Sequence, residues 1–305
     1  MNIRKISDNV TYIGGAFFSF YAVGGARPAL IELGISQLAQ CVADAFKEHI
    51  GKPPATLVAL HSHYDHAGGA ARLMDIFPNA ELAASTPAAE KISGEEYAGS
   101  CANAMQAVNE NPLFHEAYSD ADRIVVCRPI YASYMLDHGS ILGTGGDGPL
   151  QVIATPGHSK CSISLYHLRS GAMFVSDTCG VPLPSGRIWP TAFDDVDLYL
   201  KSLNLMLELR PKFLCPGHFV FFRDDRAIRF LEKSIAATAG FFATLNSLID
   251  RLGSDEDAIL AELDKEYGFD MQFIQKNVLP FGNRAMLRQA LKKRNMLSQT
   301  PVPPQ

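Results

Sequence analysis

The sequence predicts an α/β fold followed by a helical C-terminal extension, and three observations support this prediction. Up to about Cys215, short apolar runs alternate with stretches of helical periodicity, and Gly and Pro separate them. After Arg223 the periodicity is helical and no strand pattern remains. The 305 residues are 47% hydrophobic and 19% charged, which is typical of a globular protein with a sizeable core. We therefore expect an α/β body over residues 1–222, a helical extension over 223–297 and a disordered tail over 298–305.

The apolar runs and the turn residues between them place the individual elements. Strand patterns lie at Val10–Ile13, Phe18–Val23, Ala29–Glu32, Thr56–Leu60, Ala80–Ala84, Arg123–Cys127, Ser133–Leu136, Gln151–Thr155, Ser162–His167, Ala172–Ser176 and Phe213–Cys215. Helical patterns lie at Ser36–Ile50, Gly68–Phe77, Asp225–Leu252, Asp255–Tyr267 and Asn283–Met296. Residues from about 87 to 121 are polar and Ala-rich with few strand formers, which predicts a helical insert in the body.

Charge and cysteine usage argue against several classes of protein. The net charge of −5 and the pI near 6.0 give no attraction to phosphate backbones or anionic membranes, so we expect neither nucleic acid nor a membrane as partner. No apolar run follows the basic residues near the N-terminus, and no stretch approaches the length of a membrane span, so we expect no signal peptide. The six cysteines are scattered without a CxxC pair, which predicts reduced thiols and a cytoplasmic location.

The strongest local signal is the run from His61 to His66, which has the pattern HxHxDH. Its chance occurrence at any one position is on the order of one in a million, so the risk of a false match is small. His61 and His63 are two residues apart, and residues at this spacing share a face only in an extended chain. The run follows the apolar strand Thr56–Leu60 and precedes Gly68-Gly69. These side chains are therefore expected at the C-terminal end of a strand.

Three more candidate ligands follow predicted strands in the same way. His158 lies in the turn Pro156-Gly157-His158, Asp177 ends a strand, and His218 follows Pro216-Gly217. Pro-Gly forces a turn, so these histidines should come from loops at the rim rather than from the core. Imidazole and carboxylate ligands suit zinc, iron or manganese. Because four strand ends carry such residues, the sequence predicts one metal site at one rim.

In the type and order of these motifs the chain resembles the metallo-β-lactamase superfamily, over roughly residues 10–222. The resemblance implies an αββα sandwich, in which two packed β-sheets carry helices on both outer faces. It also implies two divalent metal ions, for which zinc is the first expectation and iron or manganese are alternatives. The implied ligands are His61, His63 and His158 for one ion, Asp65, His66 and His218 for the other, and Asp177 as a bridge between the two.

The reaction that the resemblance implies is hydrolysis by a hydroxide that bridges the two metal ions. The metal held by the three histidines would polarise the substrate carbonyl and stabilise the oxyanion. Asp65 would be the catalytic residue that orients the hydroxide and receives its proton. Asp177 would fix the spacing of the metals.

Differences from individual branches of the superfamily narrow the substrate class. Members that hydrolyse β-lactams are mostly exported and lack an aspartate at the position of Asp177. The diiron flavoproteins carry glutamate where this chain has His63, and RNA-processing members usually add nucleic-acid-binding segments. Glyoxalase II-like thioesterases and lactonases remain. The basic residues that hold glutathione in glyoxalase II are not recognisable in this sequence, which argues against glutathione thioesters.

A closer resemblance is to the quinolone-signal response thioesterase of bacterial quorum sensing. It lies in Ile31–Ser36, in His63–His66, and in Arg187–Pro190 leading to Phe193–Asp195. This resemblance implies a pocket roofed by helices and an aromatic or acyl thioester as substrate. Aromatic residues near the predicted rim would line such a pocket. The residues that we expect there are Tyr64, Trp189, Phe193 and Phe219, and Tyr64 would either donate a hydrogen bond to the substrate or support a neighbouring ligand.

The sequence thus predicts a dinuclear metal-dependent hydrolase whose substrate is a small acyl ester or thioester. A lactonase of the same fold is the alternative within this class, because it needs the same hydroxide and a pocket for a ring. A regulatory protein, with a metal site and partner-binding helices, is the alternative from another class. The C-terminal helices could also pair across a two-fold axis in a homodimer.

Overall fold

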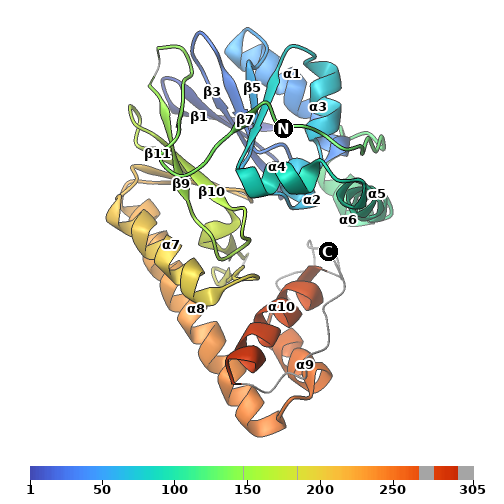
Figure 1. Ribbon diagram of the computed structural model, residues 1–305, viewed down its shortest axis with the longest axis vertical. Helices are drawn as coiled ribbons and strands as arrows, with labels where there is room; N and C mark the ends of the chain where they lie inside the picture. Colours follow the sequence, from blue (N-terminus) through green and yellow to red (C-terminus); the bar gives the residue numbers. More distant parts are fainter. Residues whose placement is uncertain (147, 184, 268–277, 295–305) are drawn as a thin grey trace.

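Two β-sheets face each other in the computed structural model, which describes residues 1–146, 148–183, 185–267 and 278–294 (Figure 1). The first sheet consists, in spatial order, of β1 (Asn2–Ser7), β2 (Val10–Gly14), β3 (Ser19–Val23), β4 (Ala29–Ile31), β5 (Thr56–Ala59), β6 (Glu81–Ala84) and β7 (Tyr134–Met135). The second consists of β15 (Phe222–Arg223), β14 (Phe213–Pro216), β11 (Ala172–Ser176), β10 (Ile163–His167), β9 (Leu150–Ala154) and β8 (Ile141–Leu142). A separate antiparallel pair is formed by β12 (Val181–Pro182) and β13 (Ile188–Trp189).

Helices cover the outer face of each sheet. Those on the side of the first sheet are α1 (Ala39–Ile50), α2 (Tyr64–Ala67), α3 (Ala70–Ile76), α4 (Thr86–Ile92), α5 (Glu95–Asn109) and α6 (Pro112–Ala117). On the side of the second sheet lie α7 (Val196–Glu208) and the first part of α8 (Asp225–Leu252). α9 (Glu256–Tyr267) and α10 (Val278–Lys293) pack against α8 and against each other, beyond the sheets (Figure 1). The order of layers is helix, sheet, sheet and helix, as Figure 1 shows, and this confirms the αββα sandwich.

The two-residue period of the strands explains why three hydrophobic clusters form. In β11, Phe174 points into the cluster between the sheets, whereas Met173 and Val175 point towards the helices of the outer layer. Tyr21 of the first sheet lies against Phe174, with 5.2 Å between ring centroids. A strand buried on both faces must be apolar throughout, which is why these strands are continuous apolar runs in the sequence.

Strand direction brings the rim loops together. β9 and β11 are both antiparallel to β10, and β14 is parallel to β11, so these three strands run the same way and end at the same edge of the second sheet. At this edge the first sheet is tied to the second by a hydrogen bond from the Ile163 N–H to the Leu60 carbonyl oxygen, 3.0 Å long. The loop after β5 therefore faces the loops after β9, β11 and β14.

The C-terminal helices contact the body through both α8 and α10. The Ser234 hydroxyl of α8 donates a buried hydrogen bond to the Cys179 carbonyl oxygen, 2.7 Å long. Arg284 and Arg288 of α10 form ion pairs with Glu256 at the start of α9, at 2.7 Å and 3.1 Å. On the other side of α10, Asn283 accepts a buried hydrogen bond from the indole N–H of Trp189, 3.0 Å long. In the part of the chain that the structure describes, no helix combines the length and apolar character that crossing a membrane requires.

The prediction of a strand at residues 123–127 is wrong. Residues 123–127 were expected to pair in a sheet, but they form no strand, because their backbone groups bond to side chains instead. The Val126 N–H donates to Ser36 Oγ, the Ile124 N–H donates to Asp122 Oδ1, and the Arg123 carbonyl accepts from the Asn109 amide. The apolar pattern of this segment reflects packing against the first cluster rather than a ladder.

Other differences concern elements that the apolar pattern did not reveal. β1 is a largely exposed edge strand, so it carries no apolar run. α7 was missed although Asp195 is an N-cap of the usual kind, accepting hydrogen bonds from the N–H groups of Asp197 and Leu198, 2.9 Å each. The helical insert is present as α4, α5 and α6. The predicted tail, 298–305, lies outside the described residues, as do the last residues of the final predicted helix.

Candidate metal centre

The HxHxDH run changes conformation in its middle. β5 ends at Ala59, and His63 is still extended, with φ −66° and ψ 150°. The single-turn helix α2 begins at the next residue and carries Asp65 and His66. His61 and His63 thus leave an extended segment on one side, as their spacing predicted, while Asp65 and His66 are turned towards a neighbouring position.

The other three candidates come from the adjacent strand ends of the second sheet. His158 follows β9 after Gly157, whose φ of +123° favours glycine. A Cβ on Gly157 would also lie 2.2 Å from the backbone nitrogen of Tyr199, so glycine allows the loop to pack against α7. Asp177 directly follows β11, and His218 follows β14. The structure therefore brings all seven predicted ligand side chains to one rim, in two neighbouring groups.

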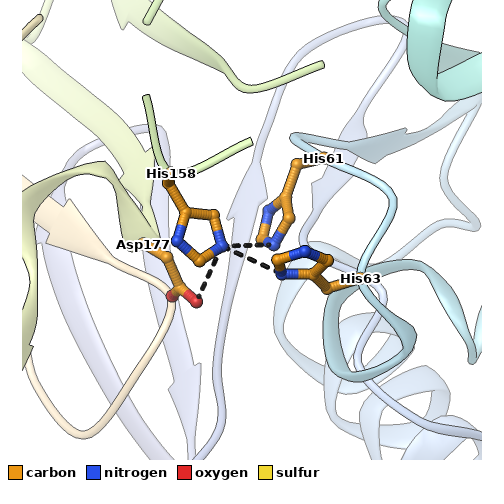
Figure 2. Close-up of side chains that lie close together, drawn as sticks. All are labelled: His61, His63, His158 and Asp177. Atoms are coloured by element: carbon orange, nitrogen blue, oxygen red, sulfur yellow. Dashed lines mark hydrogen bonds and ion pairs between the residues drawn. The ribbon is translucent and has the colours of Figure 1, made fainter. Parts of the chain in front are cut away.

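In the first group three imidazole nitrogens converge with one carboxylate oxygen (Figure 2). His158 Nε2 lies 3.2 Å from His61 Nε2, 2.9 Å from His63 Nδ1 and 3.5 Å from Asp177 Oδ2. His158 Nδ1 donates its hydrogen to the Thr191 carbonyl oxygen, 2.7 Å away, so a neutral His158 presents a bare lone pair at Nε2. A set of converging lone pairs is the arrangement that a metal ion requires.

The second group consists of Asp65, His66 and His218. Asp65 Oδ2 lies 3.5 Å from His66 Nε2 and 3.8 Å from His218 Nε2. Asp177 faces this group as well, because its Oδ2 is 3.3 Å from His66 Nε2 and its Oδ1 is 3.2 Å from His218 Nε2. The Asp177 carboxylate therefore lies between the two groups.

Two buried side chains that were not predicted as site residues orient these histidines. Glu32, just after β4, has its Oε2 2.8 Å from His66 Nδ1, and both side chains are only 2% exposed. Ser176 Oγ lies 3.1 Å from His61 Nδ1. Glu32 has φ +66° and Ser176 φ +49°, a region that costs energy for residues other than glycine. A signal for Glu32 was present in the sequence, since a carboxylate directly after an apolar strand requires a buried partner.

Burial and charge separate the protonation states of the two groups. Burial, assisted by His158, lowers the pKa of His63 to about 3, and burial also lowers the pKa of His61 and of His158. Burial acts the same way on His66, but Asp177, Glu32 and Asp65 outweigh it and raise the pKa of His66 well above its ordinary value. Burial would raise the pKa of Asp65, yet His66 and His218 lower it to about 2. The first group is thus a set of neutral imidazoles, and both aspartates of the site are ionised.

The residues fit a divalent cation. His66 Nε2 and Asp177 Oδ1 are buried, and although each lies within 3.5 Å of an ionisable group of the site, neither forms a hydrogen bond of acceptable geometry with a described residue. Buried polar atoms without partners are rare in folded proteins and call for an explanation such as a bound ion. The donors are imidazole nitrogens and carboxylate oxygens without a thiolate, which suits zinc, iron or manganese.

Comparison with known proteins decides the family. The model of the metallo-beta-lactamase superfamily matches residues 18–218. The chain belongs to the metallo-beta-lactamase superfamily. The acyl-coenzyme A thioesterase MBLAC2 of Gallus gallus is 27% identical over 190 residues, which make up 61% of this chain and 64% of the relative. The uncharacterized protein YobT of Bacillus subtilis (strain 168) is 25% identical over 196 residues, or 61% and 76% of the two chains. The present chain thus covers less than two thirds of the length of the thioesterase.

Solved structures of the superfamily share the fold. A beta-lactamase domain protein from Burkholderia ambifaria has a TM-score of 0.68 at 18% identity, covering 96% of this chain and 88% of that chain. Because most members of the superfamily are hydrolytic metalloenzymes, the family match supports a metal-dependent hydrolase.

A cavity of about 470 Å³ lies next to the two groups of candidate metal ligands. His63, Asp65, Asp177 and His218 form part of its wall, and so do the predicted pocket residues Tyr64, Trp189 and Phe193. Phe219 is not among the described side chains that line the cavity; it packs edge-on against Phe17, which does line it, with 5.1 Å between ring centroids.

Two helices that are distant in sequence complete the wall of this cavity. α5 contributes small or short side chains, among them Ser100, Cys101 and Ala104. α10 contributes Phe281, which is 48% exposed. α10 approaches closely because Gly282 has no side chain: a Cβ there would lie 2.6 Å from the Trp189 ring and 2.8 Å from the Phe193 ring. The C-terminal extension is therefore part of the site.

Proposed function

We propose that this protein is a dinuclear metal-dependent hydrolase that cleaves acyl thioesters. The observation that carries the proposal is the position of the Asp177 carboxylate between two groups of ligands on the wall of a largely apolar cavity. His61, His63 and His158 would hold one ion, and Asp65, His66 and His218 the other, with Asp177 shared. We expect zinc, with iron or manganese as alternatives, because nitrogen and oxygen donors suit all three.

Hydrolysis of a thioester forms a C–O bond with water and breaks the C–S bond, so water loses a proton and the departing sulfur gains one. Bound divalent ions would lower the pKa of a water molecule and polarise the carbonyl group. Asp65 would orient the attacking water molecule by accepting a hydrogen bond from it, because its side chain lines the cavity, is 20% exposed, and is kept ionised by a pKa of about 2. His66 and His218 hold this carboxylate in place.

The side chains that line the cavity are suited to bind the acyl group of the substrate. Phe17, Val181, Trp189 and Phe193 give it apolar walls, and Phe281 of α10 contributes another aromatic side chain. Apolar walls stabilise a bound acyl chain by removing its surface from water. The similarity to an acyl-coenzyme A thioesterase agrees with this substrate class.

The test is hydrolysis of a panel of substrates by metal-loaded protein: hexanoyl-coenzyme A, a phenyl thioester, a lactone and a phosphodiester. We expect cleavage of the thioesters, and loss of both activity and bound metal in Asp177→Asn, because the amide removes the charge that both ligand groups share. Metal content should be measured alongside activity, and two equivalents are expected in the unaltered protein. Asp177→Asn with full activity and two metals would contradict the proposal, and cleavage of the lactone alone would replace it with a lactonase.

A further inference from the structure

A second cavity adjoins the first at the metal centre. It has a volume of about 290 Å³ and is bordered by His63 and His158 of the first ligand group. Ser62, His63, Lys91 and Phe193 line both cavities. A substrate whose reacting carbonyl lies at His63 can therefore extend into both cavities at once.

The two cavities differ in chemistry. The first has mainly aromatic and small side chains away from the metal ligands. The second is lined by Lys91 and Lys160, by Ser159 and by Asp194, together with the two histidines. Within the described part of the chain, neither lysine has an ion-pair partner within 4.0 Å, although most of the basic residues of α10 are paired. Two cations thus face this cavity against one carboxyl group, so its net character is cationic.

We propose that the second cavity binds an anionic group of the thiol portion of the substrate, with Lys91 and Lys160 as its specificity-determining residues. This inference rests on the proposed thioesterase function, in which the acyl portion occupies the apolar cavity. The anion is a carboxylate a few bonds from the sulfur, because His63 and Lys91 line both cavities and Lys160 lies two residues after His158, so both lysines are close to the ligand group. The uncharged arm of coenzyme A would carry its phosphates well beyond this cavity.

The test compares two thioesters that differ only in charge, S-hexanoyl-3-mercaptopropionate and its carboxamide. In the unaltered metal-loaded protein, kcat/KM should be about fivefold or more higher for the carboxylate. Lys91→Met and Lys160→Met should each lower this preference about two- to fivefold, the range typical of an exposed ion pair, mainly through KM. The readout is the ratio of the two kcat/KM values within each protein, so a change that affects both thioesters alike leaves the preference unaltered. Lys201→Met, which changes an exposed lysine of α7 outside both cavities, is the matched control and should keep the preference.

Equal kcat/KM for the two thioesters in the unaltered protein would overturn the inference, and so would a preference that survives loss of both lysines. A lysine effect seen with hexanoyl-coenzyme A alone would also overturn it, because the anion would then be a remote phosphate. If none of the thioesters is cleaved, the proposed function fails, and the cavity is tested separately by calorimetric binding of the thioether S-hexyl-3-mercaptopropionate and its carboxamide. Tighter binding of the carboxylate, lost in the two variants, would then support the anion site by itself.

Discussion

Replacing Glu32 by glutamine tests whether a buried carboxylate controls the second ligand group. Glu32 Oε2 lies 2.8 Å from His66 Nδ1, and the side chains are both 2% exposed. Glutamine keeps the length of the side chain and an oxygen that accepts the His66 N–H; it removes the charge and places an NH₂ group where Glu32 Oε1 is buried without a hydrogen-bond partner among the described residues. A carboxylate that accepts this hydrogen makes the opposite ring nitrogen more basic and fixes the tautomer that binds metal.

The magnitude follows from the kind of hydrogen bond that is lost. A hydrogen bond to a charged group contributes about 1.5–3 kcal/mol, and one between neutral groups about 0.5–1.5 kcal/mol. The difference is about 1–1.5 kcal/mol, which corresponds to about a tenfold change in an equilibrium constant. This value lies at the lower end of the roughly 10- to 100-fold loss found when the outer partners of metal-binding histidines are changed. We expect the Glu32→Gln variant to bind the metal ion of the second ligand group, which contains His66, about tenfold less tightly.

The assay is zinc competition with a chromophoric chelator, which gives the affinity of each equivalent of metal. The matched control is Glu81→Gln, because Glu81 also accepts a hydrogen bond from a basic group, Arg27 at 2.8 Å, but on the surface with a 39% exposed side chain. The control should bind both metals as the unaltered protein does. A Glu32→Gln variant whose two zinc affinities both stay within twofold of the unaltered protein would refute the reasoning.

Three further predictions concern the cavity and the metals. Gly282→Ala should lower the melting temperature, because the added Cβ would collide with Trp189 and Phe193. Gly240→Ala is the control: the space around its Cβ is open, so the higher helix propensity of alanine should raise the melting temperature slightly. Equal shifts of the melting temperature in the two variants would contradict this prediction. Metal content should fall in two steps as the pH is lowered, the first from the group of His66. Burial lowers the pKa of His66, but the neighbouring carboxylates outweigh this effect and raise it, so protons compete with the metal ion for His66 near neutral pH. The pKa of His63 is lowered to about 3, so its group should keep its metal ion to lower pH. Loss of both ions in one step near pH 3 would be inconsistent with this order. Tyr64→Phe should leave stability nearly unchanged and lower kcat/KM about tenfold, because a hydrogen bond from its hydroxyl to the substrate is lost. Unchanged kinetics would contradict this role and leave Tyr64 as support for a neighbouring ligand.

The fold was predictable where apolar runs are long and turns are marked. β2, β3, β5, β9, β10, β11 and β14 overlap the expected stretches, because apolar side chains predominate in strands that are covered on both faces. The segment 123–127 has the same apolar character and is no strand, since its backbone partners are the side chains of Ser36, Asp122 and Asn109. Such partners are brought in by the rest of the fold, and a local pattern carries no information about them.

The sequence by itself determined the seven candidate ligands, because each lies in or next to a strand end and the HxHxDH spacing has a direct geometric meaning. Only the tertiary structure decided what surrounds them. Glu32 reaches His66 across 34 residues, Thr191 fixes the His158 ring across 33, and Phe281 meets the cavity from the C-terminal extension. The physical reason is that ligand type is a property of single side chains at marked positions, whereas burial, protonation state and cavity walls arise when segments far apart in the chain pack together.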